Sequence, residues 1–172
     1  MKRILLVSRD PRKWIRPDQL NRKSFYQNYN NTGNLVWNYG IAKILHHPDN
    51  EIVHNASPLT RQLAEEVNCT FDHVVFSFAN LIDPKRRWRF EQLLKFVPYL
   101  KLPITVCSLG AQAKLGENTS FLDPIRNEAK LLFGPIADRS NNIGVRGAFT
   151  AEILGELGFR KSVIPIGCPS FY

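Results

Sequence analysis

Short apolar runs of strand length alternate along this chain with segments whose apolar residues recur at helical spacing. The expected strands cover residues 2–8, 51–55, 72–78, 104–109, 143–145 and 162–166. The expected helices lie at about 35–46 and 59–68, within 83–97 and 119–133, and at 149–157. Apolar strands that alternate with helices are typical of parallel sheets with right-handed crossovers. We therefore predict one α/β domain over residues 1–172, with a doubly wound, mainly parallel, Rossmann-like sheet.

The clearest strand–helix–strand unit occupies residues 142–172. Its first strand ends in Arg146 and Gly147, and its second ends in the turn Gly167-Cys168-Pro169-Ser170. The helix between them is expected to bury Phe149, Ile153, Leu154 and Leu157, and Gly158 stands where a C-terminal glycine cap is expected. In the helix at 35–46 the expected inward residues are Leu35, Tyr39, Ala42 and either Ile41 or Leu45.

Four turns should share the edge of the sheet where parallel strands end, which is where such folds bind ligands. They are residues 30–34, 77–80, 108–112 and 146–147. Their glycines allow close approach of a ligand, their amides offer hydrogen bonds, and Arg146 at a helix N-terminus favours an anion. The predicted ligand carries a phosphate or carboxylate, and the candidate substrate-binding residues are Asn31, Gly33, Asn34, Gly110, Gln112, Arg146 and Gly147. Neither a GxGxxG nor a GxxxxGK[ST] motif is present.

Each candidate also has a purely structural interpretation. Arg146 could hydrogen-bond the ends of neighbouring strands, and Gly147 could serve only close packing of strand and helix. Asn31 and Asn34 could cap the helix that follows them. The Gly-Cys-Pro-Ser turn could be a structural junction. The sequence leaves these alternatives open.

Composition describes a globular chain with a basic surface. Hydrophobic residues make up 44% of the sequence, no apolar run reaches the roughly 20 residues of a membrane helix, and the N-terminus lacks a signal-peptide pattern, so we expect a cytoplasmic protein. The net charge of +8 is concentrated in two clusters, Arg9 to Lys23 and Lys85 to Arg89, each with aromatic neighbours. Nucleic-acid binding is one interpretation, but no nucleic-acid motif supports it, and solvated loops with aromatic residues turned into the core are favoured.

Cysteines and histidines suggest no catalytic or metal centre. Cys69, Cys107 and Cys168 are widely spaced and odd in number, which indicates reduced thiols rather than a disulfide framework or a zinc site. Cys168 lacks an evident basic partner, and Cys107 lies in a buried strand. His46, His47 and His54 are expected away from the ligand edge, so general acid and base residues stay unassigned and no metal is expected.

Several of these segments resemble the polysaccharide pyruvyl transferase family. They are NNTGN at 30–34, SLGAQ at 108–112 and, most specifically, GVRGAFTAEILGELGF followed by IPIGCPSFY. The resemblance implies transfer of pyruvate from phosphoenolpyruvate, as donor substrate with no further cofactor, onto a sugar or polysaccharide acceptor, as a ketal or an enol ether. It also implies a two-lobed, glycosyltransferase-like fold with the active site between the lobes.

Two departures from the family shape the expectation for this chain. Asn34 stands where the family often has an aspartate, and an asparagine can hydrogen-bond but cannot act as general acid or base. Family members are also much longer, so we expect residues 1–172 to form the N-terminal lobe and to be inactive alone. The alternative is a non-catalytic binding or assembly module that forms a homo-oligomer through its exposed inter-lobe face.

Overall fold

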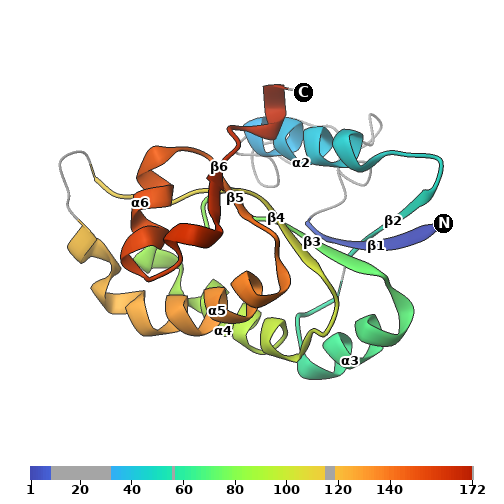
Figure 1. The fold of residues 1–172 in the computed structure, drawn as a ribbon, viewed down its shortest axis with the longest axis horizontal. Coiled ribbons are helices and arrows are strands. Elements are labelled where there is room, and N and C mark those ends of the chain that lie inside the picture. Colours follow the sequence, from blue (N-terminus) through green and yellow to red (C-terminus); the bar gives the residue numbers. More distant parts are fainter. Residues whose placement is uncertain (9–31, 56, 115–118, 172) are drawn as a thin grey trace, which may run out of the picture.

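The sheet of the computed structural model has six strands, all parallel, in the order β2-β1-β3-β4-β5-β6 (Figure 1). The structure describes residues 1–8, 32–55, 57–114 and 119–171. The strands are β1 Lys2–Val7, β2 Asn50–His54, β3 His73–Ser77, β4 Ile104–Leu109, β5 Ile143–Val145 and β6 Val163–Pro165. All six were expected from the apolar runs, and the predicted α/β, Rossmann-like fold class is confirmed.

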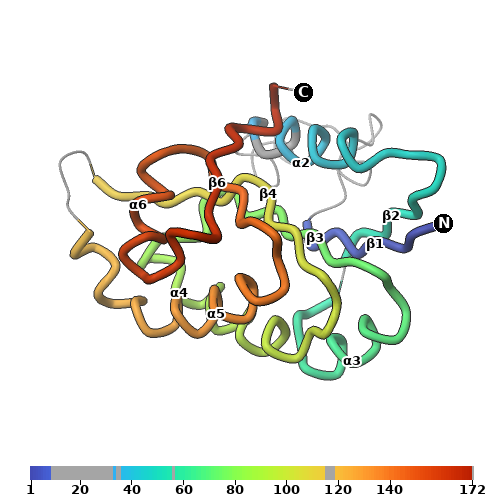
Figure 2. The backbone as a smooth tube through the Cα atoms, viewed as in Figure 1, coloured from blue at the N-terminus to red at the C-terminus, as the bar shows by residue number. Residues whose placement is uncertain are grey.

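Helices cover both faces of the sheet. The α-helices are α2 Thr32–Leu45, α3 Arg61–Thr70, α4 Arg87–Leu94, α5 Arg126–Arg139 and α6 Ala148–Glu156. Short 3-10 helices are η3 Pro84–Arg86, η4 Val97–Tyr99, η5 Thr119–Ile125, η6 Arg160–Ser162 and η7 Pro169–Phe171. Helix α2 packs on one face through Trp37 and Ile41, while α3 to α6 pack on the other around a larger apolar core. The backbone trace shows η7, in red, beside α2 (Figure 2).

The strand order defines a topological switch point between β1 and β3, which we call the crossover of the sheet. β1 pairs with β2 on one side and with β3 on the other. Helix α2, which is the first described element after β1, packs on one face of the sheet, and α4, which follows β3, packs on the other. Doubly wound folds bind ligands at such a point, beyond the carboxyl ends of the strands.

Three details of the predicted helices are corrected by the structure. Tyr39 is exposed, and Trp37, which the prediction omitted, is the buried aromatic residue of α2. Phe149 is also exposed, although its ring stacks on Phe121 with the centroids 6.2 Å apart. Helix α5 continues past the expected end to Arg139. Gly158, by contrast, has a φ of 100° after α6, so its predicted role as a C-terminal cap is confirmed.

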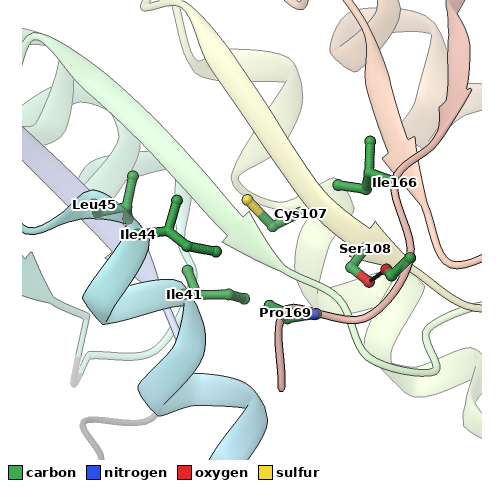
Figure 3. A pocket seen from close by; sticks show the side chains of 8 residues that line it. Ile41, Ile44, Leu45, Cys107, Ser108, Ile166 and Pro169 are labelled. Atoms are coloured by element: carbon green, nitrogen blue, oxygen red, sulfur yellow. Dashed lines mark hydrogen bonds between the residues drawn. The ribbon is translucent and has the colours of Figure 1, made fainter. Parts of the chain in front are cut away.

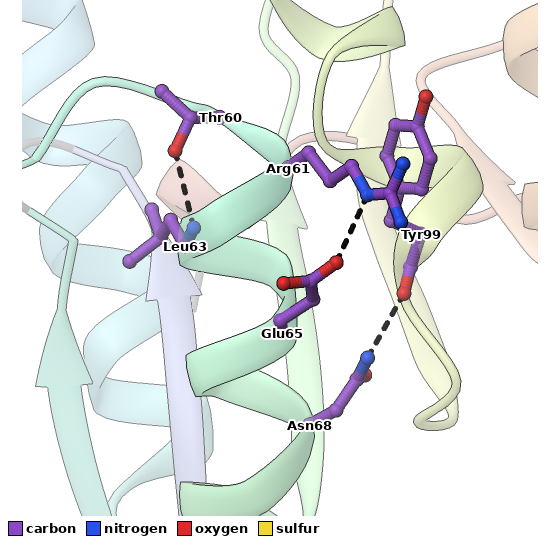
Figure 4. A network of polar contacts seen from close by, with 6 residues as sticks. All are labelled: Thr60, Arg61, Leu63, Glu65, Asn68 and Tyr99. Atoms are coloured by element: carbon purple, nitrogen blue, oxygen red, sulfur yellow. Dashed lines mark hydrogen bonds and ion pairs between the residues drawn. The ribbon is translucent and has the colours of Figure 1, made fainter.

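A polar network fastens α3 to η4 (Figure 4). Thr60 caps α3 by accepting a hydrogen bond from the backbone N–H of Leu63 at 3.1 Å. The Arg61 guanidinium pairs with Glu65 at 2.9 Å and lies 5.0 Å from the ring centroid of Tyr99. Arg61 thus offers a matched comparison for any arginine that stacks on an aromatic ring elsewhere in the protein.

Candidate functional site

The turns that follow β3 and β4 are joined by backbone hydrogen bonds. The Gly110 N–H donates to the Phe78 carbonyl at 3.3 Å, and the Ile82 N–H donates to the Gly110 carbonyl at 3.2 Å. The Gln112 N–H then donates to the Ile82 carbonyl at 2.9 Å. The two predicted turns, 77–80 and 108–112, therefore form one continuous surface beyond the strand ends.

Gly110 is required by the closeness of these two turns. A Cβ atom at this position would lie 2.3 Å from the Ala79 carbonyl oxygen and 2.9 Å from Oδ1 of Asn80. Contacts that short do not occur, so any side chain would force the turns apart. The glycine anticipated for ligand approach has a definite steric function in joining β3 and β4.

Arg146 leaves the end of β5 and reaches across to the turn after β3. Its backbone N–H donates to the Leu109 carbonyl at 2.9 Å, which fixes the start of the side chain beside β4. Its guanidinium donates to Oδ1 of Asn80 at 2.9 Å and lies 4.5 Å from the centroid of the Trp37 ring. Among the described residues no carboxylate lies within ion-pair distance of Arg146, and the side chain is exposed. An uncompensated guanidinium in this position attracts anions.

A buried polar chain supports the Trp37 ring under Arg146. The indole N–H of Trp37 donates to Oγ of Ser77 at 2.7 Å, and the Ser77 hydroxyl donates to Oδ1 of Asn38 at 3.2 Å. Trp37 is 2% exposed, so its orientation is fixed. Sequence reasoning missed both Trp37 and Asn38, although the spacing of Trp37 and Ile41 by one helical turn could have indicated the buried side of α2.

The Gly-Cys-Pro-Ser turn lies against β4 and α2. The Ser108 hydroxyl donates to the Gly167 carbonyl, and Ser108 itself has a φ of 59°, an uncommon conformation for a residue with a side chain. A Cβ on Gly40 of α2 would meet the Pro169 carbonyl oxygen at 2.1 Å, so this contact also excludes side chains. Next to it is an apolar pocket of about 210 Å³, lined by Ile41, Ile44, Leu45, Cys107, Ser108, Ile166, Gly167 and Pro169 (Figure 3). The turn therefore packs within this domain, against β4 and α2, and is also a neighbour of Arg146.

Two of the three cysteines have shifted pKa values of opposite sign. Burial in β4 raises the pKa of the Cys107 thiol to about 11. At Cys168 the smaller burial also acts to raise the pKa, but hydrogen bonds with Ser170 and the positive charge of Arg146 outweigh it and lower the pKa overall. The Cys168 Sγ lies 2.9 Å from Oγ of Ser170. Arg146 is thus one of the groups that lower the pKa of Cys168, after Ser170.

The rates of thiol alkylation should follow the order of these two pKa values. With iodoacetamide near pH 8, Cys168 is expected to react much faster than Cys107, because the reactive species is the thiolate. Arg146→Met should slow the reaction of Cys168 by raising its pKa, while Cys107 should be unaffected. Peptide mass spectrometry over a pH series would measure each rate. A Cys168 rate that Arg146→Met leaves unchanged at every pH would show that the guanidinium does not act on this thiol.

A polar cavity of about 510 Å³ opens at the crossover between β1 and β3. Its wall includes Val7 and Ser8 at the end of β1, Ser77 to Leu81 at and beyond the end of β3, and side chains from α2 and α4. Asn38, Asn55 and Asn80 contribute amides to the wall, and Arg86 and Arg89 contribute positive charge. Sequence reasoning anticipated the turn after β3 but missed Asn55 and the contribution of α4.

One histidine, His54, does not lie where the sequence analysis predicted. His54 is the last residue of β2, opposite Leu6 of β1, so it lies at the carboxyl edge and not away from it. Its Nδ1 is 3.4 Å from Oγ of Ser8. Three strands separate β2 from β5, however, which places His54 about four strand spacings, roughly 19 Å, from Arg146. His54 is therefore too distant to form an acid–base pair with groups at Arg146.

The remaining candidate residues are only partly brought together. Asn31 lies outside the described residues, and Gly33 and Asn34 belong to the first turn of α2. The Gln112 side chain is exposed at the edge. Gly147 begins α6 with extended backbone angles, and a Cβ there would meet nothing within 4 Å, so the backbone does not require glycine.

Of the two basic clusters, the structure describes only the one at residues 85–89. Residues 9–23 lie outside the described part. In the second cluster Arg86 pairs with Asp83 at 3.2 Å, and Arg87 pairs with Glu128. We favoured the interpretation that the aromatic residues of this cluster turn into the core. Phe90 is buried as this requires, but Trp88 is 52% exposed. Carboxylates therefore offset part of the positive charge of this cluster.

Comparison with known proteins settles the family. The family model described as polysaccharide pyruvyl transferase matches residues 8–172. The chain belongs to the polysaccharide pyruvyl transferase family. No curated protein and no solved structure matches the chain significantly. Family membership makes this a transferase-type protein of polysaccharide biosynthesis, with a sugar or polysaccharide as the implied acceptor.

The described residues were also searched for metal-binding groups and for membrane-spanning helices. They contain no group of three or more His, Cys, Asp or Glu side chains placed to hold a metal ion. No helix in the described ranges combines the length and the apolar character that a bilayer crossing needs.

Proposed function

We propose that this protein binds phosphoenolpyruvate at Arg146 and takes part in transfer of its pyruvyl group to a sugar. The observation that carries the proposal is the exposed Arg146 guanidinium, which is held by Asn80 and Trp37 beyond the strand ends without a carboxylate partner among the described residues. Phosphoenolpyruvate carries a phosphate and a carboxylate, and either group fits a guanidinium through paired hydrogen bonds.

The residues predicted from the sequence have distinct parts in this proposal. Arg146 neutralises one anionic group of the donor, and its low hydration compared with lysine reduces the cost of removing water. The Gly110 turn and the start of α6 at Gly147 offer backbone close to that anion, and Gln112 offers an amide at the edge. Gly33 and Asn34 are included because they belong to the first turn of α2, which begins at this edge. Asn31 is included on the resemblance alone.

The proposed reaction balances without a cofactor. One sugar hydroxyl oxygen bonds to C2 of phosphoenolpyruvate, C3 gains a proton to become a methyl group, and the C2–O bond to phosphate breaks with both electrons leaving on phosphate. A second hydroxyl then bonds to C2 to close the ketal. Of the two hydroxyl protons, one is balanced by the new methyl group and the other by hydrogenphosphate.

Proton transfer in this reaction needs groups that the described residues do not place beside Arg146. His54 is at the far side of the sheet, and Cys107 is buried with a pKa of about 11. We therefore propose that residues 1–172 act as the N-terminal lobe and that a second lobe supplies the general acid and base facing Arg146. Residues 1–172 alone should bind the donor but not turn it over.

Isothermal titration calorimetry with phosphoenolpyruvate, pyruvate and inorganic phosphate would test donor binding. We expect one site per chain and tighter binding of phosphoenolpyruvate than of pyruvate or phosphate, because only the donor carries both anionic groups. Binding should weaken as salt rises. Absence of saturable heat with millimolar phosphoenolpyruvate would refute the proposal, and dimerisation without ligand binding would favour an assembly module instead.

A further inference from the structure

We propose that the cavity at the β1/β3 crossover binds the acceptor as an N-acylated amino sugar, with the acyl carbonyl on the buried side-chain amide of Asn38. The cavity is distinct from the exposed surface at Arg146, and the two meet at Asn80, which lines the cavity and contacts Arg146. The volume of about 510 Å³ falls within the range of small-molecule sites, roughly 300–1,000 Å³. This inference rests on the proposed function, because it assigns the second substrate of the same reaction.

The indole of Trp37 fixes the direction of the hydrogen bonds behind the cavity. An indole N–H can only donate, so the Ser77 oxygen accepts it at 2.7 Å. The Ser77 hydroxyl then donates its proton to Oδ1 of Asn38 at 3.2 Å. The carbonyl side of the Asn38 amide is therefore bound to the protein, and its Nδ2 group is left as a hydrogen-bond donor.

This donor on Asn38 needs an oxygen atom as its partner. Asn38 is 9% exposed and lines the cavity, and no described residue pairs with its Nδ2 group. A buried N–H group without a partner costs free energy, so a ligand that supplies an acceptor here gains affinity. A carbonyl oxygen only accepts, whereas a hydroxyl group brings a proton that needs an acceptor of its own. The site therefore favours a sugar that carries a carbonyl group.

Apolar side chains in the wall favour an acyl group over a carboxylate. Val7, Phe78 and Leu81 line the same cavity. They can contact the methyl group of an acetamido substituent, whereas a carboxylate would lose hydration beside them. On α4 the Arg89 guanidinium lies 5.3 Å from the ring centroid of Trp88, yet Trp88 is 52% exposed and lines the cavity. The indole can therefore contact the C–H groups of the sugar ring.

Asn80 connects the acceptor site with the phosphoenolpyruvate site. The Arg146 guanidinium can only donate, and it binds Oδ1 of Asn80 at 2.9 Å. The Nδ2 group of Asn80 is thereby left as a second donor on a residue that lines the cavity. A sugar hydroxyl oxygen bound to this group lies on the same amide as Arg146. The acyl group at Asn38 thus orients the sugar, and Asn80 brings one hydroxyl group beside phosphoenolpyruvate.

Titration of the unmodified protein with N-acetylglucosamine, glucose and glucuronate tests the assignment. N-acetylglucosamine should bind roughly tenfold more tightly than glucose, because it adds a hydrogen bond to a buried donor and a methyl contact. Glucuronate should bind less tightly than N-acetylglucosamine, because its carboxylate loses hydration beside the apolar wall.

Asn38→Asp replaces the donor with an oxygen and keeps the shape of the side chain. Oδ1 can still accept from Ser77, but Oδ2 repels the acyl carbonyl, so N-acetylglucosamine should lose its roughly tenfold advantage over glucose. The matched control is Asn55→Asp, which adds the same charge to the same wall. The Asn55 amide is already paired in both directions with Ser57, at 2.9 and 3.2 Å, so this variant should keep the preference. Thermal melts should confirm that both variants are folded.

Three binding results would overturn the assignment. They are glucose bound as tightly as N-acetylglucosamine, glucuronate bound more tightly than N-acetylglucosamine, and a folded Asn38→Asp variant that keeps the preference. The first two are measured on the unmodified protein, so they decide the matter even if Asn38→Asp does not fold. Competition between phosphoenolpyruvate and N-acetylglucosamine for one site would also contradict it.

Arg146→Met separates this proposal from the one on phosphoenolpyruvate. The variant should strongly weaken phosphoenolpyruvate binding and keep the preference for N-acetylglucosamine, because Ser77 and not Arg146 orients Asn38. Absence of phosphoenolpyruvate binding in the unmodified protein, with the preference among sugars intact, would contradict the phosphoenolpyruvate proposal alone.

Discussion

Replacement of Arg146 by methionine should weaken phosphoenolpyruvate binding roughly 30- to 150-fold. The estimate follows from the loss of a charge-assisted contact worth about 2–3 kcal/mol. Methionine keeps an unbranched side chain over the Trp37 ring, so the packing 4.5 Å from that ring is largely preserved while the charge is removed. Calorimetric titration of both proteins would measure the change.

Arg61→Met is the matched control for this experiment. Arg61 also stacks on an aromatic ring, 5.0 Å from the centroid of Tyr99, and its removal changes the net charge by the same amount. It contacts Glu65 and Tyr99, and not the Asn80 and Trp37 side chains that hold Arg146 (Figure 4). Equal weakening in both variants would mean that overall charge, and not a site at Arg146, attracts the ligand.

Gly110→Ala should lower the stability of the fold by about 2–3 kcal/mol, as overpacking in a closely packed contact does. The new methyl group would lie 2.3 Å from the Ala79 carbonyl oxygen, and backbone atoms cannot move away without separating the turns after β3 and β4. For a chain of this length the midpoint of thermal unfolding should fall by roughly 4–12 °C. Circular dichroism during heating would measure it.

Gly134→Ala serves as control. Gly134 lies inside α5, and apart from its chain neighbours a Cβ there would meet nothing within 4 Å. Alanine should change stability by less than about 1 kcal/mol, because its higher helix propensity is opposed by the steric effect of Pro135 on a Cβ at the preceding residue. A Gly110→Ala variant as stable as Gly134→Ala would show that the turns are not in the close contact described.

The strands of this fold could be predicted from the sequence, because parallel strands buried on both faces have continuous apolar centres. The continuous apolar runs around Val75 and Val106 lack the spacing of a surface helix. The unit from Ile143 to Gly158 was predictable as well, because Gly158 marks the C-terminal end of its helix. Family motifs added the function, which the strand pattern alone would not have suggested.

The ends and inward faces of the helices were harder to predict from the sequence, because the burial of apolar residues can override local residue preferences. Pro135 is expected to end a helix, yet α5 runs through it to Arg139. Ile136, one residue further on, is completely buried, and the apolar burial of this face offsets the cost of the proline. On α2 the sequence analysis placed Tyr39 inward and omitted Trp37, and only packing against β1 and β3 selects Trp37.

The site was only half predictable. Arg146 and the turns at 77–80 and 108–112 could be assigned to one edge from strand polarity alone. The crossover cavity could not, because it depends on β1 lying between β2 and β3, and strand order is not contained in the apolar pattern. His54 was misplaced although strand polarity alone puts the end of β2 at this edge, and only its contact with Ser8 depends on strand order.

The most direct measurement of the central claim is an experimentally determined structure of residues 1–172 with phosphoenolpyruvate bound. The account predicts that the phosphate or the carboxylate of the ligand lies within hydrogen-bond distance of the Arg146 guanidinium, beside Asn80 and the Gly110 turn. A ligand bound elsewhere, with Arg146 still directed only at Asn80 and Trp37, would contradict the account.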